Sequence, residues 1–165
     1  MNSNLVTLRA LEPEDLELIY RIENDHKLWK WGASNVPYSH YTIRQYLEGQ
    51  HNDIFQDGQL RQVIMADSQP VGIADLTDFA PLHSRAEVGI VVLQEHQRQG
   101  IATAALQQLH HYASQMLHLR SLYAYVDIAN QPAQALFSRL GYTAKCELER
   151  WISGAESATL FQRML

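Results

Sequence analysis

The feature that most constrains this chain is a strand pattern that runs into a helix pattern through a single glycine. Residues 85–93, RAEVGIVVL, are mostly apolar, which is typical of a largely buried strand. After a short polar run, Gly100 precedes a segment in which Ile101, Ala105 and Leu109 recur at the spacing of one helix face. A buried strand followed by an amphipathic helix predicts a βα unit, in which the helix packs on a sheet.

The other segments extend this unit into a larger sheet. Hairpin patterns and βα patterns occur together, so both antiparallel and parallel neighbours are expected. We therefore predict a single domain over residues 1–165, of the α+β class, with a mixed, mostly antiparallel central sheet of about seven strands and about four flanking helices. Strands are expected at 5–9, on both sides of a turn at 67–70, at 85–93, at 119–128 and on both sides of Gly154; helices are expected at 12–24, at 42–50, from 101 onward and at 130–141; and 25–41 is expected to be a loop.

Composition disfavours several classes of function. The 165 residues carry a formal net charge of −5, whereas nucleic-acid-binding modules are usually basic, so no nucleic-acid partner is expected. The single cysteine, Cys146, precludes an intrachain disulfide and suits a reducing compartment, so we expect a cytoplasmic protein. Uninterrupted apolar stretches stay shorter than a membrane span, and no secretory signal is visible, so no membrane partner is expected. A homo-oligomer is left open.

The glycine between strand and helix is a candidate anion site. The first turn of a helix has unpaired N–H groups and a partial positive charge, and a glycine lets a phosphate approach the backbone. The alternative is that Gly100 only makes a tight turn. The two common nucleotide phosphate motifs are absent, because there is no G-x-G-x-x-G and no lysine with serine or threonine after the glycine.

Three segments together resemble the GNAT N-acetyltransferase superfamily. The stretch QRQGIA, at 97–102, resembles the family's Gln/Arg-x-x-Gly-x-Gly/Ala loop, and VGIVVL, at 88–93, precedes it as the family's central strand does. About thirty residues later, NQPAQALFSRLGY, at 130–142, is similar to the family's Asn-x-x-Ala-x-x-x-Tyr-x-x-x-Gly-Phe helix. The stretches LRALEPEDL, RAEVGI and EHQRQGIATAA look most like spermidine and diamine N-acetyltransferases, and ribosomal-protein N-terminal acetyltransferases share much of this pattern.

The resemblance implies acetyl-CoA as the acetyl donor. Backbone N–H groups of residues 97–103 would hold its pyrophosphate, and Arg98 would add a charge-assisted contact or remain a solvated cation. The strand edge at 90–92 would pair with the pantetheine amides, although its side chains also read as core. Asn130 would bind the pantetheine arm or only cap its helix. The implied cofactor-binding set is Ile90, Val91, Val92, Gln97, Arg98, Gln99, Gly100, Ile101, Ala102, Thr103, Asn130 and Phe137.

The resemblance also suggests how the acceptor amine is held and deprotonated. Glu87 is the first candidate for the general base, and its alternative role is an ion pair with Arg85 on the same strand. Asp75 matches a glutamate of the spermidine group in register, so it would hold a substrate ammonium; otherwise it faces solvent. Trp31 would wall an amine pocket by cation–π contact or anchor a lid.

The general acid is where the sequence departs from the family pattern. The family's tyrosine, seven residues after the asparagine, would face the cofactor sulfur, but Phe137 stands at that position and has no proton to donate. Tyr142, Tyr125 or water would have to take its place. We list Glu87 and Tyr142 as the candidate catalytic residues.

These expectations describe an acetyl-CoA-dependent N-acetyltransferase with a small-molecule amine substrate, most simply a polyamine or diamine. One alternative acceptor is a protein N-terminal amine. A second alternative is a CoA-binding sensor that has lost catalysis, for which Phe137 is the supporting observation. No metal is expected, because His110 and His111 are adjacent on a helix and face different ways, and no H-E-x-x-H motif is present.

Overall fold

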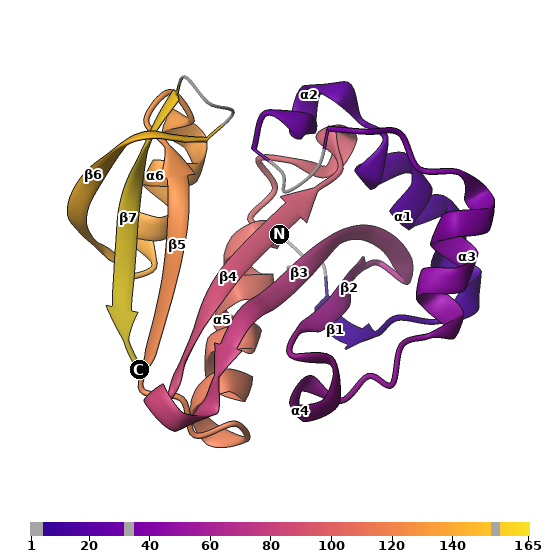
Figure 1. Cartoon of the computed structure of the whole chain (residues 1–165), viewed down its shortest axis with the longest axis horizontal. Coiled ribbons are helices and arrows are strands. Elements are labelled where there is room, and N and C mark those ends of the chain that lie inside the picture. Colours follow the sequence, from indigo (N-terminus) through magenta and orange to yellow (C-terminus); the bar gives the residue numbers. More distant parts are fainter. Residues whose placement is uncertain (1–4, 32–34, 153–155) are drawn as a thin grey trace.

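The chain forms a seven-stranded mixed sheet with helices on both faces (Figure 1). The computed structural model describes residues 5–31, 35–152 and 156–165. Within these ranges β4 and β5 are the one parallel pair, and all other neighbours in the order β1-β2-β3-β4-β5-β7-β6 are antiparallel. The strands are β1 (Val6–Ala10), β2 (Leu60–Ala66), β3 (Gln69–Ala80), β4 (Arg85–Val92), β5 (Ser121–Asp127), β6 (Thr143–Ile152) and β7 (Glu156–Met164).

The helices divide between the two faces of the sheet. The described ranges contain α1 (Leu16–Glu23), α2 (His26–Trp29), α3 (His40–Glu48), α4 (Ile54–Asp57), α5 (Ile101–Gln115) and α6 (Gln131–Arg139). Helices α5 and α6 contribute to one buried cluster, which we call the α5/α6 cluster, and α1 and α3 contribute to the other, the α1/α3 cluster. None of these helices has both the length and the apolar character needed to cross a bilayer.

The alternation of side chains along each strand separates these two clusters. On β4, Ala86 and Val88 belong to the α5/α6 cluster. On β3, Ala74 and Leu76 belong to the same cluster. Successive strand residues point to opposite faces. The residues between these pairs, at positions 75 and 87, therefore point to the face covered by α1 and α3.

The parallel pair at the centre of the sheet is incomplete. Strands β4 and β5 pair only between residues 85–87 and 121–123, and beyond that point they diverge (Figure 1). Helix α5, which connects them, packs behind this region against β1, β3 and β4. In the described chain, residues 88–92 of β4 therefore face a gap rather than a partner strand on their β5 side, although they remain paired with β3 on the other side.

The sequence predicted the class and the sheet correctly, and the differences lie in the short elements. The segment 25–41 is not all loop, because α2 forms over His26–Trp29 and α3 begins at His40. The described ranges hold six helices rather than about four, and two of the six, α2 and α4, are single turns of four residues. Both turns are capped by an aspartate that accepts a hydrogen bond, a local signal that the apolar periodicity does not carry. The expected turn at Gly154 lies outside the described residues.

Candidate active site

The loop before α5 has the geometry of an anion site. Gly100 caps the helix with φ +81°, a left-handed conformation that favours glycine, and a Cβ at this position would meet nothing within 4 Å. The helical hydrogen bonds of α5 begin at Ala104, whose N–H donates to the Gly100 carbonyl at 3.0 Å. The N–H groups of Ile101, Ala102 and Thr103 precede it, so they are the unpaired donors of the first turn. These groups and the open space at Gly100 fit a phosphate.

Gln97 plays a different part in this loop from the one expected. Its N–H donates to the Gln94 carbonyl at 3.3 Å, and its side chain donates to the Val92 carbonyl at 2.9 Å. The side chain of Gln99 donates to the Glu95 carbonyl at 3.3 Å. We therefore correct the assignment of the Gln97 N–H as a phosphate donor, because that group already has an acceptor. Gln97 ties the loop to the end of β4.

The open edge of β4 fits an extended ligand beside the loop. Ile90, Val91 and Val92 lie on the part of β4 that has no partner on its β5 side. Their side chains are also core: Ile90 and Val92 contact the α5/α6 cluster, and Val91 contacts the α1/α3 cluster. Both interpretations of this segment are thus compatible, because the side chains pack above and below the sheet while the backbone edge faces the gap.

A cavity of about 580 Å³ adjoins this edge on the α1/α3 face. Its floor includes Asp75 of β3 and Gly89, Ile90 and Val91 of β4. Its walls come from α1, α2, α3 and two residues between α2 and α3, Trp31 and Tyr38. They are mostly apolar and aromatic: Ile19, Ile22, Leu28, Trp29, Trp31, Tyr38, Ile43 and Tyr46. The expected substrate residues Asp75 and Trp31 therefore line one cavity together. We call it the acceptor pocket.

Asp75 lies directly against the strand that borders the gap. A Cβ built on Gly89 would be 3.5 Å from the Asp75 Oδ2 atom, an ordinary contact distance, so the carboxylate lies directly over Gly89. Only 18% of the Asp75 side chain is exposed. Burial raises the pKa of Asp75, and the neighbouring guanidinium of Arg61 opposes that increase. The alternative considered for Asp75, a strand residue that faces solvent, is therefore not supported.

Arg61 joins Asp75 to a second acid in the pocket. Its Nε atom is 3.0 Å from the Asp75 Oδ1 atom, and its Nη1 atom is 2.8 Å from the Glu23 Oε1 atom. The guanidinium carbon also lies 5.7 Å from the centre of the Tyr46 ring. Arg61 and Glu23 could not be recognised from the sequence, because both are ordinary charged residues far from each other along the chain.

Glu87 is on β4 and points to the same face of the sheet as Asp75 on β3. It lies two residues before Gly89, which is the residue opposite Asp75. It opposes Thr77 on β3 and Tyr123 on β5, and it is not part of the pocket lining. Burial raises the pKa of Glu87, and the negative charge of Asp78 raises it further. Among the ion pairs of the described residues there is none between Glu87 and Arg85. The alternative role of Glu87, an ion pair with Arg85, is therefore not supported.

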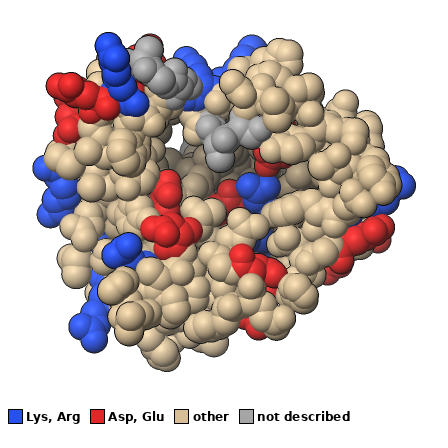
Figure 2. Space-filling model, in the orientation of Figure 1, with Lys and Arg blue, Asp and Glu red and all other residues tan. Residues whose placement is uncertain are grey.

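Acidic groups border the hollow between the two parts of the sheet. Figure 2 shows acidic side chains around this opening, with basic side chains nearby. On its β5 side the Tyr123 hydroxyl donates to Asp78, and the Tyr125 ring lies 5.3 Å from that of Trp151. Burial raises the pKa of Tyr125, and the charge of Glu87 adds to the increase. Tyr125 is therefore a protonated hydroxyl on the same side of the sheet as Glu87.

Tyr142 does not join this site, and we correct its assignment as the general acid. Its side chain is 3% exposed within the α5/α6 cluster, on the face of the sheet opposite Glu87. Its hydroxyl is 2.8 Å from the Nε2 atom of His110, and burial raises its pKa. Burial lowers the pKa of His110 to about 4, so the ring is neutral near pH 7. The pair is a buried polar contact of the core.

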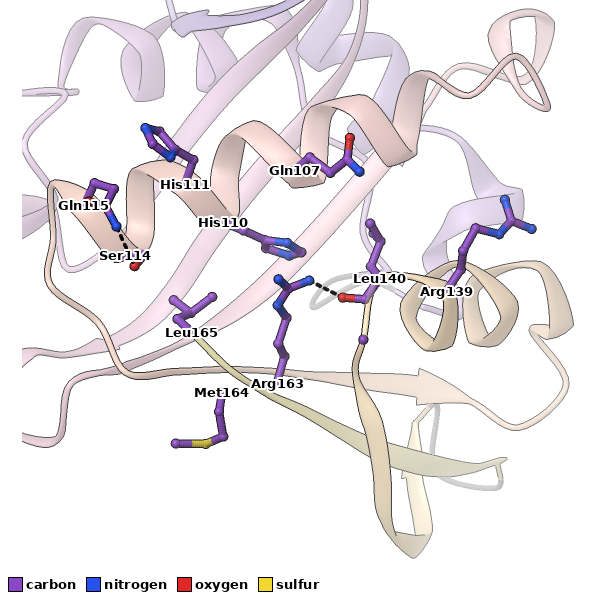
Figure 3. Close-up of a pocket in the computed structure, with 11 residues that line it drawn as sticks. Gln107, His110, His111, Ser114, Gln115, Arg139, Leu140, Arg163, Met164 and Leu165 are labelled. Carbon is purple, nitrogen blue, oxygen red and sulfur yellow. Dashed lines mark hydrogen bonds between the residues drawn. The ribbon is translucent and has the colours of Figure 1, made fainter.

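A second cavity, of about 680 Å³, lies on that opposite face between α5, the end of α6 and β7 (Figure 3). His110 and Arg163 point toward one another there, and the Arg163 guanidinium donates to the Leu140 carbonyl. None of the residues assigned to the site from the sequence lines this cavity. The larger cavity is therefore not the expected acceptor site.

Asn130 and Phe137 take the structural roles that the sequence left open. The Oδ1 atom of Asn130 accepts from the Ala133 N–H at 3.2 Å and caps α6. Phe137 is 4% exposed, and its ring contacts those of Tyr142 and Phe161. Contact of either residue with the cofactor stays a prediction.

Trp31 connects the acceptor pocket to β5. Its indole Nε1–H donates to the Oδ2 atom of Asp127 at 2.9 Å, although 41% of the residue is exposed. Asp127 is 3% exposed and ends β5, so this hydrogen bond crosses from the α2 side of the gap to the β5 side. Trp31 thus lines the pocket and is tied to the end of β5, while its cation–π contact with an amine and its role as a lid anchor stay predictions.

We expect the substitution Phe137→Tyr to destabilise the protein without restoring a missing acid. A hydroxyl buried in the aromatic part of the α5/α6 cluster without a partner would lower the free energy of unfolding by about 1–3 kcal/mol. Urea unfolding measures that change, and steady-state kinetics should show less than a roughly tenfold change in kcat. Phe161→Tyr is the matched control, since Phe161 is equally buried beside Phe137. A hundredfold gain in kcat for Phe137→Tyr alone would contradict the core role.

Comparison with known proteins gives a consistent result. The family description "Acetyltransferase (GNAT) domain" matches residues 6–143. A spermidine N(1)-acetyltransferase of Escherichia coli (strain K12) is 30% identical over 155 residues, covering 93% of this chain and 82% of that protein. A putative ribosomal N-acetyltransferase of Bacillus subtilis (strain 168) is 28% identical over 142 residues, covering 83% and 77%. The crystal structure of spermidine N-acetyltransferase from Vibrio cholerae in complex with CoA and spermine superposes with a TM-score of 0.83 at 25% identity, covering 96% and 95%.

Proposed function

The chain belongs to the GNAT acetyltransferase family and transfers acetyl from acetyl-CoA to an amine, and from this premise we propose that its acceptor is a small polyamine or diamine. The observation that carries the proposal is the position of Asp75, a largely buried carboxylate in a pocket that opens beside the unpaired edge of β4. Such a carboxylate binds an ammonium group where the acetyl group has to be delivered. The named spermidine N-acetyltransferases support the same acceptor class.

Acetyl-CoA fits the loop and the strand edge and, when bound, supplies the acetyl group as a thioester. The N–H groups of Ile101, Ala102 and Thr103 would bind its diphosphate, with Gly100 leaving the approach open. The backbone edge of residues 90–92 would hydrogen-bond the pantetheine amides as an added strand does. Backbone N–H groups on the same edge are the candidate donors to the oxyanion that forms during acyl transfer.

Glu87 removes the proton from the acceptor amine in this proposal. An aliphatic ammonium has a pKa near 10.4 and no lone pair, so the amine must lose a proton before it can attack a carbonyl. The raised pKa of Glu87 makes its carboxylate a stronger base than an exposed glutamate. Asp75 on β3 holds the ammonium. Glu87, which points to the same face from the neighbouring strand β4, accepts the proton directly or through water.

Tyr125 or water supplies the proton for the leaving thiolate. Phe137 has no proton to give, and the Tyr142 hydroxyl lies on the opposite face. A thiol with a pKa near 8.5 is already a fair leaving group, so the absence of one acid does not prevent turnover. This argument favours an active enzyme over a degenerate CoA-binding sensor.

A panel of amines tests the acceptor class directly. We expect turnover of acetyl-CoA with spermidine and 1,4-diaminobutane, followed as release of free CoA thiol. The second candidate is a protein N-terminal amine, favoured by the likeness to the ribosomal N-acetyltransferase of Bacillus subtilis. Turnover only on peptides would replace the proposed acceptor with this one, and CoA binding without turnover on any amine would indicate the sensor. Action in the cytoplasm, self-association and the absence of a metal remain proposals from the sequence.

A further inference from the structure

The acceptor pocket contains its own cation. The Arg61 side chain is 23% exposed and lies between the carboxylates of Glu23, which is 29% exposed, and Asp75. Burial alone would lower the pKa of Arg61, but Asp75, Tyr46 and Glu23 together hold it above its ordinary value, so the guanidinium stays charged. Three of its N–H bearing atoms contact these two acids.

The charge of the pocket is therefore −1 and not −2. Among the described residues of its lining, the charged side chains are those of Glu23, Arg61 and Asp75, and they sum to a single negative charge. One ammonium group neutralises the pocket. A second ammonium would have no uncompensated carboxylate in the lining, and charges are costly to bury without a partner.

The rest of the lining suits an uncharged chain. Leu28, Trp29, Trp31 and Tyr38 belong to the apolar and aromatic part of the lining. Apolar and aromatic walls favour the methylene or aromatic part of a ligand. The pocket thus offers one position for an ammonium group at its floor and an apolar wall for the rest of the ligand.

Building on the proposed acetyl transfer to an amine, we propose that Arg61 is a specificity-determining residue that limits the acceptor pocket to a single ammonium group. The part of the acceptor bound in the pocket is then an aminoalkyl end with an apolar body. If the acceptor is a diamine or polyamine, its remaining ammonium groups lie outside the pocket, on the acidic border that includes Asp78. Replacing Arg61 with a neutral residue opens a second cation position between Glu23 and Asp75.

The experiment compares two ligands of equal carbon number, butylamine and 1,4-diaminobutane. Calorimetry in the presence of CoA gives their dissociation constants for the wild type and for Arg61→Gln. At pH 8.5 the amines are still cationic, since an aliphatic ammonium has a pKa near 10.4, and Asp75 is paired with the Arg61 guanidinium. We expect Arg61→Gln to raise the preference for the diamine over the monoamine roughly tenfold, because one more unit of negative charge acts on the second ammonium.

Two further variants distinguish an effect of the pocket charge on the ligand preference from an effect of altered folding. Glu23→Gln/Arg61→Gln restores the pocket charge to −1, so its preference should return to the wild-type value within about twofold. Arg44→Gln removes one positive charge from an exposed position of α3 outside the pocket and should leave the preference unchanged. An unchanged preference in a folded Arg61→Gln protein would overturn the proposal, as would an equal shift in the double variant. If neither amine binds the wild type or is acetylated by it, the proposed acceptor class fails first and the role of Arg61 fails with it.

Discussion

The substitution Gly100→Glu should weaken CoA binding by more than about a hundredfold. Gly100 has φ +81°, which strains any other residue, and a carboxylate there would lie against the N–H groups that would bind the diphosphate. The backbone strain at position 100 and the repulsion between the new carboxylate and the diphosphate both act on this loop. Both therefore raise the dissociation constant for CoA. Calorimetric titration with CoA measures it, and circular dichroism shows whether the fold is kept.

Gly58→Glu is the matched control for this prediction. Gly58 also has a left-handed φ, +67°, also lies at a helix end, and would also place a new Cβ in open space. It belongs to the connection between α4 and β2 rather than to the loop before α5. The control should therefore carry the same strain and keep CoA binding. Equal affinity of the Gly100→Glu protein and the wild type would remove this loop from the cofactor site.

The sequence predicted the parts of the site that depend on neighbouring residues. The loop before α5 could be located because a strand, a glycine and a helix follow one another along the chain, and Asn130 could be recognised as a cap for the same reason. In each case the relevant geometry is set within a few residues.

The remaining features depend on contacts between distant segments. Glu23, Arg61 and Asp75 come from α1, β2 and β3, and only the pairing of the two strands and the packing of α1 bring them together. Tyr142 was misassigned because its distance from the helix motif along the sequence does not reveal which face of the sheet it occupies. Its buried contact with His110, on α5, decides that question.

The substitution Glu87→Gln should lower kcat/KM by about 10²–10⁴-fold near neutral pH, the usual contribution of a general base. The loss should shrink as the pH rises, because more of the acceptor amine is then already deprotonated. In the wild type, Glu87 works as a base only when ionised, so kcat/KM should fall as the pH falls through its raised pKa. The glutamine variant has no such group and should lack that acidic limb.

The substitution Asp78→Asn tests the cause of the raised pKa. Asp78 lies on β3 near Glu87, and its negative charge disfavours ionisation of Glu87. Removing that charge should lower the pKa of Glu87, so the acidic limb of the kcat/KM profile, scaled to the plateau of each protein, should move to lower pH. Glu87→Gln should remove the limb, whereas Asp78→Asn should only displace it. A change of less than about threefold for Glu87→Gln at every pH would exclude Glu87 as the base, and Asp75, beside Gly89, would then be the next carboxylate to replace.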